Sequence, residues 1–172
     1  ISTMGGRAQA CEAGQSWVWD GVRFELLHPR AGQLSSPGIK PNSVSCVLRI
    51  QNARGRSALL TGDIEAEQEA RLIRAYGPGS AEPSLASTLL LVPHHGSRTS
   101  STASFIDAVS PRWAVVQAGY LNRYGHPAAP VLRRYEEAQI PLLLTSACGL
   151  IRWQGDEPEC WRHAHRRYWQ WK

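Results

Sequence analysis

Two short polar motifs follow apolar, strand-like runs, and both contain residue types that bind divalent metals. The first is Thr61-Gly62-Asp63, which offers a carboxylate beside a glycine. The second is Pro93-His94-His95-Gly96-Ser97, which offers two adjacent imidazoles. Open α/β sheets build their sites at the carboxyl ends of strands, where a carboxylate and an imidazole can ligate a metal. Asp63 also has a plainer alternative role, which is to cap the helix that follows it.

The two histidines are expected to have different tasks, because neighbouring side chains leave the backbone in different directions. One can be a ligand while the other contacts substrate or supports the site. A third motif, from Gly119 to Pro127, also follows a strand-like run, and it contains an amide, a guanidinium, a phenol and an imidazole. Such groups bind phosphate oxygens and transfer protons. Its alternative role is a turn that leads into a helix, and the two roles are compatible.

The elements that position these motifs alternate between strands and helices, which predicts an α/β layered fold. Asp20-Gly21 predicts a tight hairpin turn, and the loop at 28–41, rich in Gly, Pro and Ser, is placed to lie over a site. The predicted strands are 16–19, 22–27, 46–51, 58–61, 89–92, 113–117 and a closing pair at 141–145 and 150–153. The predicted helices are 65–76, 103–109 and 130–138.

Charge and cysteine content narrow the class of protein. A net charge of +5 favours affinity for polyanions such as nucleic acid or anionic lipid, with good solubility as the alternative. No apolar run reaches the roughly 18 to 20 residues that a membrane span needs, and Ile1 suggests a piece of a longer protein. The cysteines lack CxxC spacing, which argues against structural zinc. Cys46 is predicted to be buried, and Cys11 with Cys160 form a candidate pair in an oxidising compartment.

Four segments, taken together, resemble the C-terminal half of the metallo-β-lactamase domain in ComEC-family competence proteins. They are residues 42–48, 59–65, 92–101 and 122–127, and the resemblance covers about Val44 to Trp153. It implies the C-terminal portion of a metallo-β-lactamase-like αββα sandwich over residues 1–156. Residues 157–172 are then a separate basic and aromatic tail.

The resemblance also implies roles for the site residues and two metal ions, manganese or zinc. Asp63 would bridge the metals, and His95 would ligate one of them from the position of the histidine in a Pro-Gly-His-Gly-like turn. The residues expected to serve the phosphate or to protonate the leaving oxygen are His126, Asn122 and Arg123. The residues expected to support the ligands or contact substrate are His94 and Ser97.

The chain departs from the family pattern at its main metal motif. No string of the form His-x-His-x-Asp-His or Ser-x-x-Asp-x-Asp-His occurs in it, so residues outside this chain are expected to complete the site. Asn42 stands in the region of the fold's third histidine motif, which predicts fewer nitrogen ligands and greater tolerance of manganese.

The function implied by the resemblance is that of a metal-dependent phosphodiesterase or nuclease domain in a DNA-uptake channel, which degrades the strand that is not transported. Its partners would be DNA and the remainder of a polytopic membrane protein, and it would be a soluble domain on the outer or periplasmic face of the inner membrane. Two alternatives remain open. One is a hydrolase of the same fold that acts on another phosphoester or a lactone, and the other is a non-catalytic module that binds DNA or docks on the channel.

The C-terminal tail allows two interpretations of equal weight. Residues 161–172 interleave Arg and Lys with Trp and Tyr, a pattern that single-stranded nucleic acid binders use for charge contacts and stacking. Trp161, His165 and Tyr168 recur at helical spacing, which favours a helix that packs on the domain instead.

Overall fold

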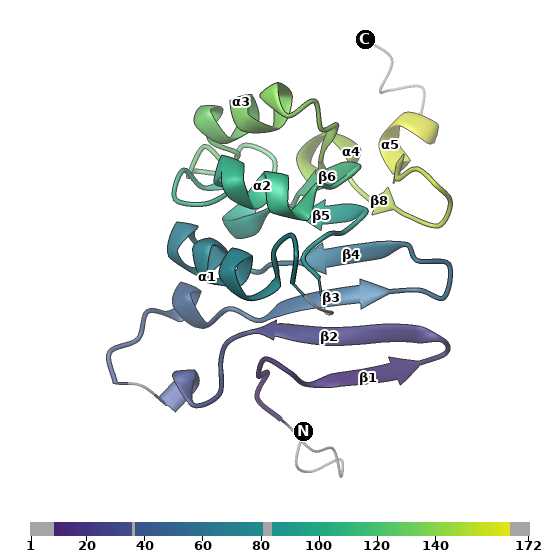
Figure 1. Ribbon diagram of the computed structural model, residues 1–172. Helices are drawn as coiled ribbons and strands as arrows, with labels where there is room; N and C mark the ends of the chain where they lie inside the picture. The colour runs from purple at the N-terminus through teal and green to yellow at the C-terminus, as the bar shows by residue number, and fades with distance from the viewer. Residues whose placement is uncertain (1–8, 36, 81–83, 166–172) are drawn as a thin grey trace, which may run out of the picture.

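The computed structural model describes residues 9–35, 37–80 and 84–165. A seven-stranded mixed sheet forms the centre of the domain, and its strands are ordered as they follow in the sequence (Figure 1). The first four strands pair antiparallel and the last three join in parallel, which confirms the α/β class. The strands are β1 (Ser16–Trp19), β2 (Val22–His28), β3 (Val47–Gln51), β4 (Ser57–Leu60), β5 (Leu89–Leu91), β6 (Trp113–Val116) and β7 (Leu142–Leu144).

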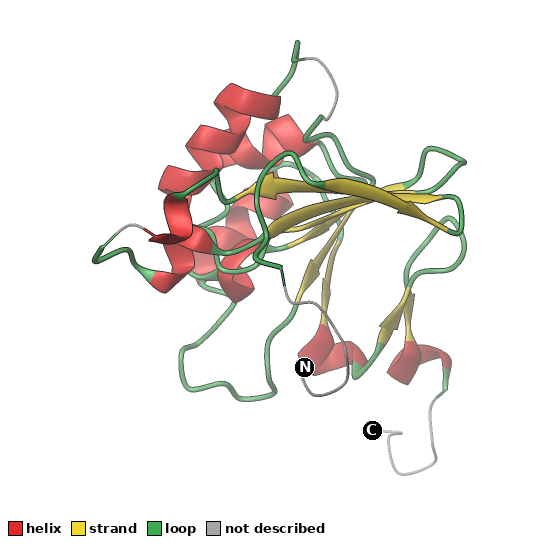
Figure 2. Cartoon of the chain, turned by 90° about the horizontal axis from the view of Figure 1, so that it is seen from below, coloured by secondary structure: helices red, strands yellow, loops and turns green. Residues whose placement is uncertain are grey.

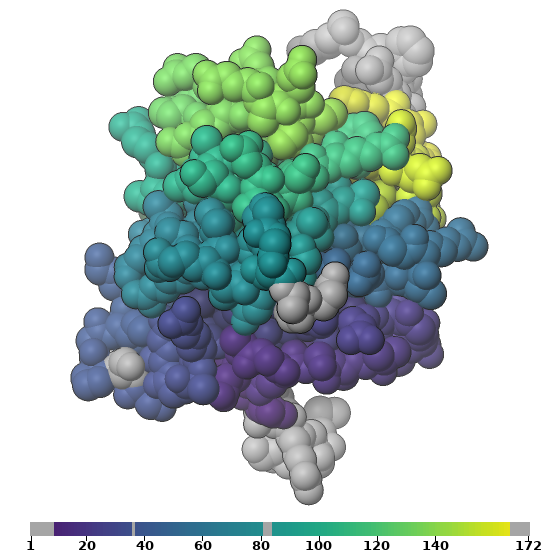
Figure 3. All heavy atoms as spheres, viewed as in Figure 1, coloured from purple at the N-terminus to yellow at the C-terminus, as the bar shows by residue number. Residues whose placement is uncertain are grey.

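Three helices connect the parallel strands, and all three cover the same face of the sheet (Figure 2). They are α1 (Ala66–Tyr76), α2 (Ala103–Val109) and α3 (Ala129–Glu137), and each was predicted to within one residue at either end. The core lies between these helices and the sheet, where Leu59, Leu90, Phe105 and Tyr135 are almost fully buried. Because the sheet grows in sequence order, the surface shows the chain as bands from the N-terminal strands up to α3 (Figure 3).

The opposite face of the sheet, which we call the outer face, is also apolar. Phe24, Ile50 and Ala58 are register partners on adjacent strands, and they alternate with residues that point into the core. Trp17 stacks on Phe24 with ring centroids 5.1 Å apart, and Trp17 remains 44% exposed. A pocket of about 260 Å³ lies on this face between Val22, Ile50, Ala58 and Trp153.

The predicted closing strand pair is wrong. β7 pairs with β6 in parallel, and the next residues form a short helix, α4 (Thr145–Cys148). The Thr145 hydroxyl donates to the Ala118 carbonyl and accepts from the Ala118 N–H, at 3.1 and 3.0 Å, and these bonds tie the segments after β7 and β6 together. A second sheet follows, made of β8 (Ile151–Arg152) and β9 (Glu159–Cys160), and the last described helix is α5 (Trp161–Ala164).

The loop predicted over 28–41 contains one short helical turn and leads into another. These 3₁₀ turns are η2 (Gln33–Ser35) and η3 (Pro41–Val44). In the described part of the chain, no helix combines the length and the apolar character needed to cross a membrane.

All four cysteines are paired, but not as the sequence suggested. Cys11 bonds to Cys46 and Cys148 bonds to Cys160, so the proposed pairing of Cys11 with Cys160 is wrong. Cys46 is exposed rather than buried. The N-terminal segment runs back along β2, where the Gly14 N–H donates to the Leu26 carbonyl at 2.9 Å, and this brings Cys11 next to the start of β3.

Replacing Cys148 and Cys160 together with alanine should lower the free energy of unfolding by about 3 kcal/mol, because the unfolded chain regains the entropy of a small loop. The two cysteines are 12 residues apart. Urea unfolding followed by tryptophan fluorescence measures the change. Adding reductant to the double variant serves as the control, since it then reports the Cys11–Cys46 bond alone. A double variant as stable as the oxidised wild type would contradict the pairing.

Candidate functional site

Asp63 lies just beyond the carboxyl end of β4. The Thr61 hydroxyl donates to the Leu91 carbonyl at 2.7 Å and ties the ends of β4 and β5 together. Gly62 has a φ of +56°, and a Cβ there would lie 3.0 Å from the Cβ of Ser45. The Asp63 backbone N–H then donates to Ser45 Oγ at 3.2 Å. This close approach to Ser45 fixes the start of the Asp63 side chain at the edge of the sheet.

The alternative role for Asp63 as a helix cap is wrong. α1 begins at Ala66, and its N-cap residue is Glu65. The Glu65 backbone N–H donates to Gln68 Oε1 at 3.2 Å, which is the return half of a capping box. The Asp63 carboxylate is therefore left for other contacts, and its side chain is 43% exposed.

His95 faces Asp63. Its Nε2 lies 3.5 Å from Asp63 Oδ1, and its Nδ1 lies 2.7 Å from the Gln117 carbonyl oxygen. A carbonyl oxygen only accepts, so Nδ1 carries a proton, and Nε2 is the ring nitrogen that faces the carboxylate. Metal-bound histidines are commonly held by such a bond on the opposite ring nitrogen.

His94 points away from this pair. The turn η4 (Pro93–Gly96) holds His94 and His95 at φ values of 49° and 56°, and the His94 N–H donates to the Gly62 carbonyl at 3.0 Å. His94 Nδ1 lies 3.5 Å from both Glu65 Oε1 and Thr99 Oγ1. Two successive left-handed residues are costly for side chains with a Cβ, and here they separate the two imidazoles.

Glu65 is a residue of this cluster that the sequence interpretation missed. It accepts from Asn42 Nδ2 at 3.3 Å and lies beside His94. Glu65 stands only two residues after Asp63, which could have indicated a place near the site, but it was predicted only as the first residue of a helix. Ser97 lies in the loop that follows the histidine turn, where its hydroxyl is 3.1 Å from Thr99 Oγ1.

The loop between β6 and α3 places His126 beside the histidine turn. Asn122 holds this loop, since its Oδ1 accepts from the His126 N–H at 2.9 Å and its Nδ2 donates to the His126 carbonyl at 2.7 Å. Arg123 lies at the exposed rim, where its guanidinium donates to the Tyr124 hydroxyl at 2.6 Å. The side-chain amide of Asn122, which was expected to contact phosphate, thus bonds to the backbone of its own loop and holds the shape of that loop.

His126 lines a pocket of about 190 Å³ together with His95, Gln117, Asn122 and Tyr124. Its ring centroid lies 6.1 Å from that of His94, and its Nδ1 is buried with no hydrogen-bond partner among the described residues. Burial lowers the pKa of His126, and the neighbouring His94 and His95 lower it further. The ring is therefore neutral near pH 7.

A close contact at Gly96 joins this loop to the histidine turn. Gly96 has a φ of +79°, and a Cβ there would lie only 2.6 Å from the Cβ of Pro127. The Ala128 N–H donates to the Gly96 carbonyl at 2.9 Å. The second and third motifs are thus packed together directly at a residue that has no side chain.

A buried carboxylate fixes the segment that follows the histidine turn. Glu69 on α1 is fully buried and accepts from the N–H groups of Ser101 and Thr102 at 2.5 and 2.8 Å. Arg134 on α3 donates to the Ser101 carbonyl at 2.9 Å. Burial raises the pKa of Glu69, while the hydrogen bonds from Thr102 and Ser101 oppose this rise. No local pattern indicates this role, because Glu69 looks like a surface residue of a helix in the sequence.

The arrangement brings together two candidate metal ligands, Asp63 and His95. Within residues 9–35, 37–80 and 84–165, no group of three or more His, Cys, Asp or Glu is placed to hold a metal ion. Asp63 and His95 form a carboxylate–imidazole pair, which is a common ligand combination for divalent metals. The Gln117 carbonyl holds His95, and Ser45 Oγ holds the Asp63 backbone. The donor set therefore fits part of a coordination sphere.

The described part of the tail packs on the domain. Arg162 donates to the Ala147 carbonyl at 2.9 Å, and Trp161 stacks on His165 with ring centroids 3.5 Å apart. The guanidinium of Arg152 lies 4.8 Å from the centre of the Trp161 ring. Residues 166–172, which carry most of the predicted charge and stacking, lie outside the described residues.

The fold and site define a mixed α/β domain with a carboxylate and histidine cluster at one end of its parallel strands. Its sequence is 39% identical over 161 residues to the competence protein ComA of Neisseria gonorrhoeae, which covers 92% of this chain and 22% of ComA. It is 37% identical to YcaI of Escherichia coli K12, over 74% of this chain and 16% of YcaI. It is 35% identical to ComE operon protein 3 of Bacillus subtilis, over 77% of this chain and 16% of that protein.

These homologues support the resemblance of the chain to the ComEC family of competence proteins, which was inferred from its sequence motifs. No family model matches the chain. The chain spans about a fifth of the length of its relatives, or less.

Proposed function

We propose that this chain is part of a metal-dependent nuclease domain that serves DNA uptake in natural transformation and degrades the strand that is not transported. The observation that carries the proposal is the pair formed by Asp63 Oδ1 and His95 Nε2, 3.5 Å apart, with the other nitrogen of His95 held by a backbone carbonyl. The competence protein ComA supports the biological context, since it is a relative across nearly the whole chain.

The fold we propose is the C-terminal portion of a metallo-β-lactamase-like αββα sandwich over residues 1–156. One sheet with its three connecting helices on a single face is half of such a sandwich (Figure 2). The apolar outer face supports this, because exposed apolar surface of this kind is usually covered by another layer. A second sheet from elsewhere in the protein would bury Trp17, Phe24 and Ile50.

In this proposal Asp63 and His95 hold manganese or zinc, and further ligands come from residues outside this chain. The metal supplies Lewis-acid stabilisation of charge on the phosphate. His126 lines the pocket beside His95 and serves the phosphate there, since a ring that is neutral near pH 7 has no acidic proton to give to the leaving oxygen. Asn122 orients His126 by its bonds to the His126 backbone, and Arg123 provides positive charge at the rim. His94, in contact with Glu65, supports the histidine turn.

The 172-residue chain alone should bind manganese or zinc only weakly, because two ligands satisfy a small part of a sphere that needs about four to six. Isothermal titration calorimetry measures this directly, with Asp63→Ala as the control for site-specific heat. Sub-micromolar binding by this chain would contradict the proposed division of ligands.

The nuclease proposal is tested by comparing this chain with a version of the protein extended at its N-terminus. The longer version should cleave single-stranded DNA with manganese, and the 172-residue chain should not. If the longer version hydrolyses other phosphoesters but not DNA, the hydrolase alternative replaces this proposal. If it binds DNA and cleaves nothing, the non-catalytic module replaces it.

We also propose that the domain faces the outer or periplasmic side of the inner membrane, attached to the remainder of a polytopic channel protein. Two disulfides that use all four cysteines support this side, because disulfides persist in oxidising compartments and are rare in the cytosol.

A further inference from the structure

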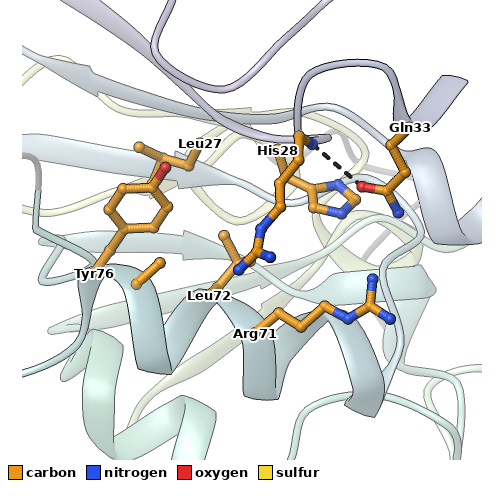
Figure 4. A pocket seen from close by; sticks show the side chains of 8 residues that line it. Leu27, His28, Gln33, Arg71, Leu72 and Tyr76 are labelled. Carbon is orange, nitrogen blue, oxygen red and sulfur yellow. Dashed lines mark hydrogen bonds between the residues drawn. The ribbon is translucent and has the colours of Figure 1, made fainter.

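A small basic pocket lies between the end of β2, the turn η2 and helix α1, apart from the residues assigned above. Figure 4 shows His28 and Gln33 on one side of it and Arg71, Leu72 and Tyr76 of the helix on the other. Arg30 also lines it, and its volume is about 20 Å³. No carboxylate lines this pocket in the described part of the chain.

His28 presents an unpaired hydrogen-bond acceptor here. The residue is 3% exposed, and its Nδ1 lies 2.8 Å from the Ser45 carbonyl oxygen. That oxygen accepts only, so Nδ1 carries the proton and Nε2 has a bare lone pair. Nε2 is buried and has no partner among the described residues. A buried acceptor without a partner is costly, and a cavity of this size has room for one water molecule.

The guanidinium groups of Arg30 and Arg71 line the pocket beside His28. Burial lowers the pKa of His28 despite the hydrogen bond to Ser45, and the charges of Arg71 and Arg30 lower it further. His28 is therefore neutral near pH 7, and the charge of the pocket comes from the two guanidinium groups. Arg71 pairs with Glu67, but the Glu67 side chain is 67% exposed, so that contact is easily exchanged for another anion.

Ser45 links the pocket to the candidate metal pair. Ser45 gives its carbonyl to His28 and its hydroxyl to the Asp63 N–H. Because His28 and Asp63 both contact Ser45, the pocket lies next to the candidate metal pair. Guanidinium groups are well suited to phosphate oxygens, which they contact through paired N–H donors.

We propose that this pocket binds a backbone phosphodiester of the DNA strand held at the Asp63–His95 pair. Arg30 and Arg71 donate to the phosphate, and one water in the cavity donates to His28 Nε2 and to a phosphate oxygen. The inference rests on the proposed function for its ligand, but it concerns different residues and does not require a bound metal.

The test measures binding of a fluorescent oligothymidylate to the 172-residue chain over a series of salt concentrations. Arg30→Gln and Arg71→Gln should each weaken binding about tenfold, as expected for a lost charged hydrogen bond, and should lower the salt slope by about 0.7. Arg74→Gln is the matched control, because Arg74 is an exposed arginine of the same helix that does not line the pocket. Thermal melts of all variants check that they remain folded.

NMR of the His28 ring provides a second measurement on the unmodified chain. Both the oligonucleotide and inorganic phosphate should shift the His28 resonances, and Arg30→Gln should reduce the shift. If phosphate shifts His28 but DNA does not, the assignment to nucleic acid is overturned. If the chain binds DNA with identical salt slopes in wild type and both pocket variants, the pocket proposal fails while the nuclease proposal stands, since nuclease activity of the longer protein decides that one.

Discussion

Asp63→Ala should reduce manganese-dependent DNA hydrolysis by the longer protein about a thousandfold, because bound metal stabilises charge in the transition state by several kcal/mol. DNA affinity should stay near that of wild type, since the basic surface is untouched. The fold should also survive. The Asp63 side chain is 43% exposed, and its backbone N–H keeps the bond to Ser45. Initial rates and fluorescence anisotropy measure the two quantities separately.

Asp107→Ala is a suitable control for this variant. Asp107 is an exposed aspartate on α2, outside the pocket that contains His95 and His126, so its removal changes the net charge by the same amount. It should leave hydrolysis unchanged. A folded Asp63→Ala protein that cleaves DNA at the wild-type rate would remove Asp63 from the site.

Gly96→Ala should destabilise the domain by about 2–5 kcal/mol, through the left-handed backbone and the overpacked contact together. The new Cβ would lie 2.6 Å from Pro127 Cβ and 3.0 Å from Pro127 Cα, so one of the two loops must move. Because that contact joins the histidine turn to the His126 loop, activity should fall even in molecules that stay folded. Urea unfolding measures the loss of stability.

Two other glycines separate these contributions. Gly125 has a φ of +65° and open space around its Cβ position, so Gly125→Ala should cost only about 1–2 kcal/mol for its backbone conformation. Gly119 has open space and no positive φ, so Gly119→Ala should be nearly neutral. If Gly96→Ala is no worse than Gly125→Ala, the contact with Pro127 is looser in solution than in the structure.

Local patterns predicted most of the sheet and its three long helices, because each element carries its own signal. The Asp20-Gly21 turn fixes the first hairpin, and the Gly77-Pro78 stop ends α1. The segment after β7 was mispredicted because its conformation depends on distant partners. Thr145 bonds to Ala118, and Cys148 bonds to Cys160, and neither contact is visible in the local sequence.

The site shows the same division between local and distant information. Strand ends predicted that Asp63 and the histidine turn would lie near one another, and the structure places His95 against Asp63. Which way each imidazole points depends on the Gln117 carbonyl and on Glu65, which come from other elements. Asn122 and Glu69 likewise hold loops by hydrogen bonds to backbone groups, and only folding brings those groups close to them.

The order of the sheet affects how the domain acquires its structure. Each strand pairs with the one made just before it, so every addition closes only a short loop and the chain can fold from its N-terminus onward. The Cys11–Cys46 bond joins the segment before β1 to the residue before β3 and can form before the parallel part exists. If the segment is delivered gradually across a membrane, as proposed above, its first hairpins can form while the residues of the His95 and His126 loops are still arriving.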